Sequence, residues 1–339
     1  MEMDKLLVSA QKEFGEKARI GSQVASVEAC PTGVPSLDVA LGIGGWPKGG
    51  LSMVFGPKSS GKSSLTYISV AEFQRTHEDK FAAIIDLEGS FDPDWVKKLG
   101  VDPDNVLILS PYSGEEAMKN LIWCSQKEEL GLVIFDSIGA MASERELEED
   151  GKKQAYGQSG LITDMVKKAG PRFNASDRVC VLINQVRDTA NMRNLPMVHA
   201  PGGHALHHAC AVIIQMRPGN TKYMTKNEFG DEIQVGYRPV LTINQSKIGP
   251  PKRNAEYDFY WEDSALHKSG IDIEESLITS AIRIGVVNRQ VSMYEFEDEK
   301  IRGRENFFAW VREDPARFER LRDQFYQKFE EIRSGTPNE

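Results

Sequence analysis

Hydrophobic residues in the middle of the chain come in short runs, which alternate with longer segments that have the composition of helices. Between about residues 35 and 262 these short runs are rich in strand-forming residues. Such alternation predicts an α/β fold in which helices cover a mostly parallel sheet. We expect strands at 51–55, 82–86, 106–109, 132–136, 179–183, 211–216 and 239–245.

A helix is predicted before this core, over residues 3–18, with Asp4 as its N-cap. It carries an apolar stripe made of Leu6, Leu7, Ala10 and Phe14. An apolar stripe on a helix is normally buried against another surface. Packing on its own domain and docking onto a neighbouring subunit both satisfy that requirement.

The pattern changes after about residue 264 to helices with a small strand pair. Helices are predicted at 272–284 and 304–311, and a strand at 291–295. A last helix begins with Asp314 as its cap and Pro315 at its first position. Four arginines are expected on a solvated face of this region: Arg312, Arg317, Arg320 and Arg322. The predicted division is an N-terminal helix and linker (1–33), a core (34–263) and a small α+β C-terminal domain (264–339).

Composition and charge narrow the class of protein. The chain has 339 residues, of which 40% are hydrophobic and 27% charged, as in a globular protein of about two domains. A net charge of −9 argues against a uniformly basic surface, although a locally basic channel for nucleic acid remains compatible with it. The four cysteines form no C-x-x-C pair, which favours reduced thiols. Without a membrane-length apolar run or a signal sequence, we expect a cytoplasmic protein with no membrane partner.

The stretch 56–63 has the spacing G-x-x-x-x-G-K-[ST] between a strand and a helix, which is the context of a phosphate-binding loop. We therefore predict an ATP site, with Lys62 at the β- and γ-phosphates and the Ser63 hydroxyl on Mg²⁺. A chance glycine-rich turn is the alternative. The residues expected to bind the nucleotide here are Gly56, Pro57, Lys58, Ser59, Ser60, Gly61, Lys62, Ser63 and Ser64.

Two carboxylates follow predicted strands, where ligands of α/β proteins collect. Asp136 ends the strand 132–136 and is expected to hold Mg²⁺ together with Ser63. Glu88 follows the strand 82–86 and could orient or deprotonate a water molecule. The structural alternatives are an aspartate that caps a turn and a solvated glutamate.

Two polar segments interrupt the core and are candidates for DNA contacts. The segment 144–159 carries Lys152 and Lys153. The segment 186–203 carries Arg187 and Arg193, and Met197 could wedge between bases. Mobile surface excursions are the alternative for both. His199, His204, His207 and His208 lie near the second segment, and we favour interface or core positions for them over a metal site.

These motifs together resemble the bacterial RecA recombinase family, in order and over nearly the whole chain. The resemblance rests on the segment Pro31 to Gly42, the phosphate-loop motif, Ile85 to Glu88 with Asp92-Pro93, Ile183-Asn184-Gln185, and Gly303 to Trp310. Any one of these motifs occurs in many ATPases. Their order and spacing are much more specific.

The resemblance implies a RecA-like phosphate-loop ATPase core and names further site residues. Glu88 would be the general base, Asp92 and Trp95 would contact adenine, and Gln185 would sense the γ-phosphate. Lys247 would reach the γ-phosphate of a neighbouring subunit, and the second DNA segment would close at Gly202 and Gly203. The implied cofactors are ATP and Mg²⁺. The implied partners are single-stranded DNA, a homologous DNA duplex and further copies of the chain in a helical filament.

The chain also departs from the family pattern. Gln245 stands where a lysine is often found, and His207 and His208 replace a Lys-Phe pair at the subunit interface. Asn194 stands where the second segment has an aromatic residue, and a strongly acidic tail is missing. A divergent, phage-borne member would fit these changes. The rival functions are a RecA-core motor or helicase and a DNA-coating structural protein with a regulatory ATP site.

Overall fold

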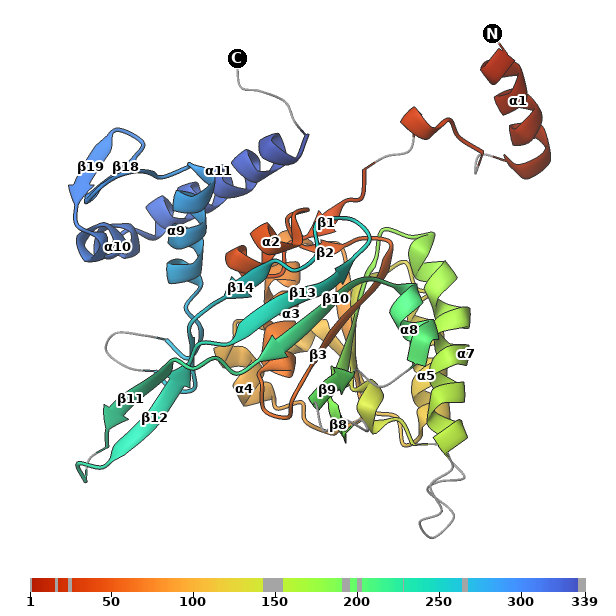
Figure 1. Cartoon of the computed structure of the whole chain (residues 1–339), viewed down its shortest axis with the longest axis horizontal. Helices are drawn as coiled ribbons and strands as arrows, with labels where there is room; N and C mark the ends of the chain where they lie inside the picture. The colour runs from red at the N-terminus through yellow and green to blue at the C-terminus, as the bar shows by residue number, and fades with distance from the viewer. Residues whose placement is uncertain are drawn as a thin grey trace.

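An eight-stranded sheet forms the centre of the computed structural model (Figure 1), which describes residues 2–15, 18–23, 26–142, 155–190, 196–199, 203–227, 229–263 and 268–334. The strand order is β14-β13-β10-β3-β7-β6-β4-β5. Neighbours from β10 to β5 pair in parallel, while β13 and β14 add an antiparallel edge. The predicted mostly parallel sheet is therefore confirmed. Its strands are β3 (Gly50–Gly56), β4 (Phe81–Asp86), β5 (Val106–Leu109), β6 (Leu130–Asp136), β7 (Val179–Gln185), β10 (Cys210–Arg217), β13 (Val240–Ser246) and β14 (Asn254–Glu256).

Helices cover both faces of this sheet, and the alternation of side chains along each strand decides which face a residue joins. Val54 and Ile84 pack in one cluster with helices α2 (Pro35–Leu41), α3 (Lys62–Thr76) and α4 (Pro93–Lys98). Their sequence neighbours Phe55 and Ile85 pack in the other cluster with α5 (Gly114–Cys124), α7 (Ala155–Asn174) and α8 (Gly203–Ala209). The two clusters give the central region a three-layer architecture.

Smaller elements decorate this core. A four-stranded sheet contains β11 (Lys222–Lys226), β12 (Glu232–Tyr237), β15 (Phe259–Tyr260) and β16 (Gly270–Ile271). Its hairpin β11–β12 projects away from the core (Figure 1). Two further strand pairs are β1 (Ala29–Cys30) with β2 (Trp46–Pro47), and β8 (Arg187–Ala190) with β9 (Pro196–His199). The short 3-10 helices are η2 (Gly21–Gln23), η3 (Pro103–Asn105) and η4 (Ile138–Ala140).

The C-terminal part has its own hydrophobic cluster. It contains α9 (Ile273–Ile284), β17 (Asn288–Gln290), β18 (Met293–Phe296), β19 (Glu299–Arg302), α10 (Arg304–Arg312) and α11 (Pro315–Ser334). The expected strand pair is wrong, because β17, β18 and β19 form a three-stranded sheet. All three residues of β17 are exposed, so this strand has no apolar alternation that the sequence could reveal. The predicted boundary between 263 and 264 adjoins residues outside the described part and stays a prediction.

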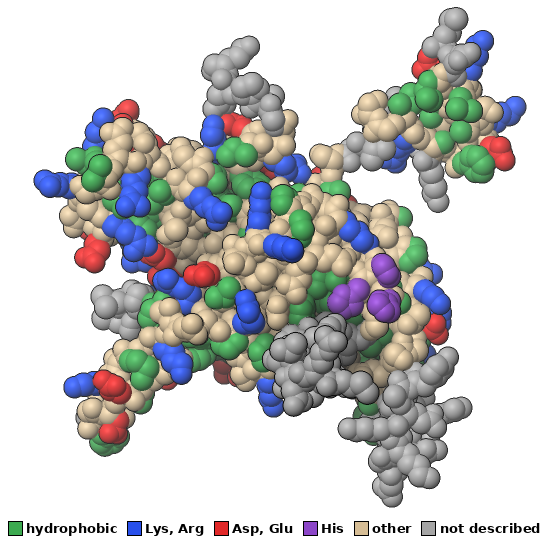
Figure 2. All heavy atoms as spheres, in the orientation of Figure 1, with side chains coloured by type: hydrophobic (Ala, Val, Ile, Leu, Met, Phe, Trp, Pro, Cys, Tyr) green, Lys and Arg blue, Asp and Glu red, His purple; other side chains and the backbone are tan. Residues whose placement is uncertain are grey.

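Helix α1 (Glu2–Phe14) stands apart from the rest of the chain (Figure 1). It begins before Asp4, so the expected N-cap position of that residue is wrong. It ends at Phe14 because Gly15 adopts a φ of +73°, a left-handed conformation that glycine tolerates. Leu6 is 64% and Phe14 65% exposed, and green hydrophobic side chains mark the surface of this helix in Figure 2. The stripe is therefore not packed on the chain's own core.

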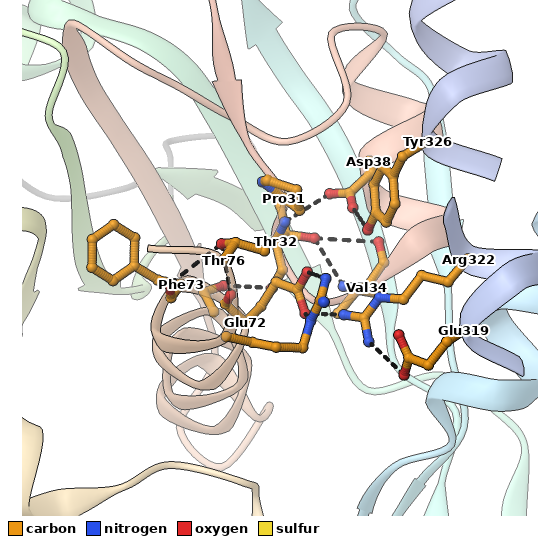
Figure 3. Close-up of polar contacts among 12 residues, drawn as sticks. Pro31, Thr32, Val34, Asp38, Glu72, Phe73, Thr76, Glu319, Arg322 and Tyr326 are labelled. Carbon is orange, nitrogen blue, oxygen red and sulfur yellow. Dashed lines mark hydrogen bonds and ion pairs between the residues drawn. The ribbon is translucent and has the colours of Figure 1, made fainter. Parts of the chain in front are cut away.

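A buried polar cluster joins α11 to the core (Figure 3). Arg322 is only 8% exposed and forms an ion pair with Glu72 of α3, so its expected solvated position is wrong. The reason is helical spacing, since Arg322 shares one face with Phe325 and Phe329. Tyr326 donates a hydrogen bond to Asp38 of α2 at 2.8 Å. Three segments that are distant in sequence therefore meet at these side chains.

The carboxyl of Asp38 gives this cluster a pH dependence. Burial raises the pKa of Asp38 to about 7, against the hydrogen bonds from Thr32 and Tyr326 that favour its charged form, while nearby Glu72 raises it further. Because the folded protein holds this proton more tightly than the unfolded chain, the resulting stability is present below about pH 4 and is lost as pH rises through about 7.

We predict that Asp38→Asn removes this contribution. The free energy of unfolding of the wild type should fall relative to that of the variant between pH 4 and pH 8, by at most about 1.4 kcal/mol per pH unit for one group. Urea unfolding of both proteins across this range measures the difference. Parallel pH profiles for the two proteins would exclude a titrating Asp38.

Candidate nucleotide site

The loop between β3 and α3 has a backbone that only glycine allows at two positions. A Cβ on Gly56 would lie 2.1 Å from the Met216 carbonyl oxygen. Gly61 has a φ of +90°, and a Cβ there would lie 2.5 Å from the Tyr237 hydroxyl. Helix α3 starts directly after this turn, at Lys62. The loop therefore places backbone N–H groups and the positive end of a helix together, as an anion site requires.

Two polar side chains inside the loop fit a bound anion. Lys62 is 7% exposed, and its Nζ donates to the carbonyl oxygens of Gly56 at 3.1 Å and Pro57 at 2.7 Å. Burial lowers the pKa of Lys62, while Asp136 and Glu88 act in the opposite direction. The buried Ser60 hydroxyl has no hydrogen-bond partner among the described residues. A phosphate group would give the Ser60 hydroxyl the acceptor that a buried hydroxyl requires, and it could also accept from the third N–H of Lys62.

The two residues expected to hold Mg²⁺ are in direct contact. The Ser63 hydroxyl donates to Asp136 Oδ2 at 2.6 Å, which connects the start of α3 with the end of β6. Burial raises the pKa of Asp136 to about 6, and Glu88 and Asp86 add to the shift, while Ser63 and Lys62 oppose it. A hydroxyl and a carboxylate oxygen are suitable ligands for Mg²⁺. Since the described residues hold no group of three or more His, Cys, Asp or Glu arranged for a metal, the cation would also need oxygens from phosphate and water.

Glu88 receives two hydrogen bonds on one carboxylate oxygen. Gln185 Nε2 donates to Glu88 Oε1 at 2.7 Å, and the Ser137 hydroxyl donates to the same atom at 2.6 Å. These residues follow or end β4, β6 and β7, which lie side by side in the sheet. Sequence reasoning singled out Glu88 and Gln185 but missed Ser137. Its position directly after Asp136 was the only available signal.

A group of aromatic side chains lies beside the loop, and only Trp95 among them was named from the sequence. Tyr237, which contacts Gly61, stacks on Trp261 with ring centroids 5.5 Å apart. Phe259 lies between Tyr237 and Trp95, with centroid distances of 5.7 and 6.3 Å. The predicted adenine residue Asp92 is the N-cap of α4, since its Oδ1 accepts from Asp94 N at 2.9 Å and Trp95 N at 3.3 Å. Tyr237 and Trp261 were not predicted, because they are far in sequence from the phosphate-loop motif.

The candidate DNA segments differ from the expected loops. Helix α7 already begins at Ala155, so the loop expected at 144–159 is too long. The expected loop 186–203 contains the antiparallel pair of β8 and β9, in which Thr189 pairs with Met197. Arg187 begins β8, and Gly203 begins α8. The remaining predicted contacts lie outside the described residues: Lys152, Lys153, Arg193 and Gly202.

The residues expected at a subunit interface contact α8 within the chain. Lys247 Nζ donates to the His208 carbonyl, and Gln245 Nε2 donates to the His207 carbonyl at 3.0 Å. The rings of His204 and His208 lie 6.3 Å apart. Both are exposed, so a core position is wrong for these two, and histidine side chains gather on this face in Figure 2. The expected contact of Lys247 with the γ-phosphate of a neighbouring subunit stays a prediction.

The fold and the loop define the class of α/β proteins with a phosphate-binding loop at the end of a parallel strand. Sequence comparison then gives the family, because the RecA N-terminal domain matches residues 1–266. The chain belongs to the RecA family.

Similar proteins cover almost the whole chain. Protein RecA of Chlorobium limicola is 34% identical over 332 residues, or 96% of this chain and 90% of that protein. Protein RecA of Chlorobaculum parvum is 32% identical over 97% of this chain and 91% of its own length. Protein RecA of Paracoccus denitrificans is 33% identical over 92% and 86%, respectively. Across the described residues, the helices are all too short or too polar to span a membrane.

Proposed function

We propose that this protein is an ATP-dependent homologous recombinase that polymerises on single-stranded DNA and exchanges strands with a homologous duplex. The observation that carries this proposal is the hydrogen bond from Gln185 to Glu88. It joins the proposed catalytic carboxylate to the residue directly before the second candidate DNA segment. Family membership and the phosphate-loop geometry support the same function.

Each residue of the site has a proposed role in ATP hydrolysis. The loop N–H groups and Lys62 hold the phosphates, and Ser63 with Asp136 hold Mg²⁺. When bound, Mg²⁺ neutralises charge that develops on the phosphate oxygens. Glu88 accepts the proton of a water whose oxygen bonds to the γ-phosphorus, while the bond from that phosphorus to the ADP oxygen breaks. Tyr237 and Trp261, with Asp92 and Trp95, offer the flat surface and polar edge for adenine.

The exposed stripe of α1 supports self-association. Its large apolar side chains are exposed, and a second copy of the chain is the occupant that a filament would supply. We propose that Lys247 completes the γ-phosphate site of that neighbour. The proposed DNA contacts are Arg187, Arg193, Met197, Gly202 and Gly203, together with Lys152 and Lys153. Contacts to the DNA backbone suffice, because base pairing between the strands supplies the sequence recognition.

We predict that the γ-phosphate controls the affinity for single-stranded DNA. Binding of a fluorescent oligonucleotide should be at least about tenfold tighter with a non-hydrolysable ATP analogue than with ADP, a typical coupling between two sites. Gln185→Ala should reduce the difference because it removes the link to the second candidate DNA segment, and Lys62→Ala should remove it by weakening nucleotide binding. Equal affinities with the two nucleotides in the wild type would contradict the proposal.

A strand-exchange assay with the same protein separates the rival functions. Exchange of a homologous strand, with open helical filaments in electron micrographs, is the expected result. Closed rings without strand exchange would instead indicate a RecA-core motor. DNA coating without ATP hydrolysis stimulated by single-stranded DNA would indicate a structural protein.

A further inference from the structure

In the turn that follows β6, the side chain of Ser137 makes a hydrogen bond that is unusual for the residue at the start of a helix. Ser137 occupies the N-cap position of η4, where a serine side chain normally accepts a hydrogen bond from the backbone of the helix. No such capping bond is made here. The fully buried hydroxyl donates to Glu88 Oε1 at 2.6 Å instead. Its contact with the carboxylate therefore takes the place of a local contribution to the turn.

The same turn is held from α7 by Gln158. Gln158 Nε2 donates to the carbonyl oxygens of Ile138 at 3.3 Å and Gly139 at 3.2 Å. The Ile138 carbonyl also accepts from Met141 N at 3.2 Å within the turn, so Gln158 reinforces that bond and adds one to the Gly139 carbonyl. On another side η4 packs on β7, since a Cβ on Gly139 would lie 3.4 Å from the Gln185 Cβ. The turn is thus fixed between α7 and the end of β7.

We propose that Ser137 and Gln158 are positioning residues for Glu88. Gln158 holds η4 in place, and η4 in turn holds the Ser137 hydroxyl against Glu88 Oε1. Both hydrogen-bond donors that reach this carboxylate in the described structure, Ser137 and Gln185, use Oε1. Oε2 is then the oxygen directed to the attacking water. This inference rests on the proposed role of Glu88 as general base.

The arrangement ties the base to both candidate DNA segments. Gln185 directly precedes the second segment, and Gln158 follows Lys152 and Lys153 closely in sequence. One route to Glu88 is the direct bond from Gln185, and the other runs from Gln158 through η4 to Ser137. A displacement of α7 would act on the same carboxylate oxygen as a displacement of β7. The two chains of contacts are therefore separate, and both end at Glu88.

Steady-state ATP hydrolysis of the full chain on saturating single-stranded DNA tests whether Ser137 positions Glu88. Ser137→Ala should lower kcat about tenfold, the effect of one hydrogen bond to a charged group, and leave the KM for ATP within about twofold. A residue with a purely structural role would not separate kcat from KM in this way. Wild-type kcat in a folded Ser137→Ala protein would overturn the inference.

A double-mutant cycle tests whether Gln158 acts through Ser137. Gln158→Leu should lower kcat about threefold in the wild-type background and have a clearly smaller effect in Ser137→Ala, because the proposed connection from Gln158 to Glu88 runs through the serine. Effects that multiply in the double variant would overturn that connection. Asp164→Asn, on the exposed side of α7, is the matched control and should leave kcat unchanged.

Glu88→Gln, assayed alongside, separates failure of this inference from failure of the proposed function. Ordinary turnover in Glu88→Gln would mean that Glu88 is not the base, and the inference would fall with it. An inactive Glu88→Gln together with a fully active Ser137→Ala would leave the base in place and remove only the positioning role.

Discussion

Glu88→Gln should bind ATP with nearly the affinity of the wild type and hydrolyse it about 10²- to 10⁴-fold more slowly, which is the usual contribution of a general base. The amide retains an oxygen that can accept the hydrogen bonds from Ser137 and Gln185, so the surrounding structure has no reason to change. It cannot accept a proton from water. A coupled assay for ADP release with saturating single-stranded DNA measures the rate, and titration with a fluorescent ATP analogue measures binding.

Two comparisons make this result specific. Glu78→Gln changes the same functional group at an exposed position of the core and should leave the rate unaltered. The Glu88→Gln protein should also remain longer on single-stranded DNA in the presence of ATP, because the γ-phosphate persists. If hydrolysis continues at the wild-type rate, another group deprotonates or orients the water.

The largest loss of stability is expected for Glu72→Leu, at about 3–5 kcal/mol in urea unfolding, because this change leaves the charge of Arg322 buried without its main partner. The next carboxylate, Glu319, is 4.0 Å from Arg322. Arg322→Met should lower the free energy of unfolding by less. Glu72 then still has an ion pair with Arg75, whose Nη2 is 2.9 Å from Glu72 Oε1. The order of these two variants therefore follows from the geometry of the pair.

The double variant Glu72→Leu with Arg322→Met should recover much of the loss, because neither charge is then left buried and two apolar side chains fill the space. Arg320→Met, on the same helix, is the matched control. Arg320 forms an exposed ion pair with Glu297 at 3.0 Å, and its removal should have little effect. A large loss in the control, or a double variant no more stable than Glu72→Leu, would contradict a buried pair of this kind.

Local sequence patterns were sufficient to predict most elements of the core. The predicted strand at 51–55 is found as β3, and the segment 132–136 as part of β6, because buried parallel strands read as short apolar runs. The phosphate loop was equally visible, since its glycines are required by backbone conformation and close contacts along one short segment. The start of α11 at Pro315 was predicted because caps act within one turn.

Errors arose where a residue or strand is specified by a partner that its own sequence pattern does not reveal. Arg322 was expected in solvent, because a charged residue on a helix is usually exposed and nothing nearby reveals Glu72. β17 was missed because a strand without apolar residues is specified only by its neighbour β18. The pair of β8 and β9 was read as an open loop for the same reason.

The sequence by itself determined the α/β class, the phosphate loop and the two strand-end carboxylates, because each depends on residues that are close along the chain. Only the tertiary structure decided that Ser137 and Gln185 share one oxygen of Glu88, and that Tyr237 and Trp261 stand beside the loop. The physical reason is that strand order in a parallel sheet is set by crossovers and packing. Neighbouring strand ends, and the chemistry that they bring together, are therefore not neighbours in the sequence.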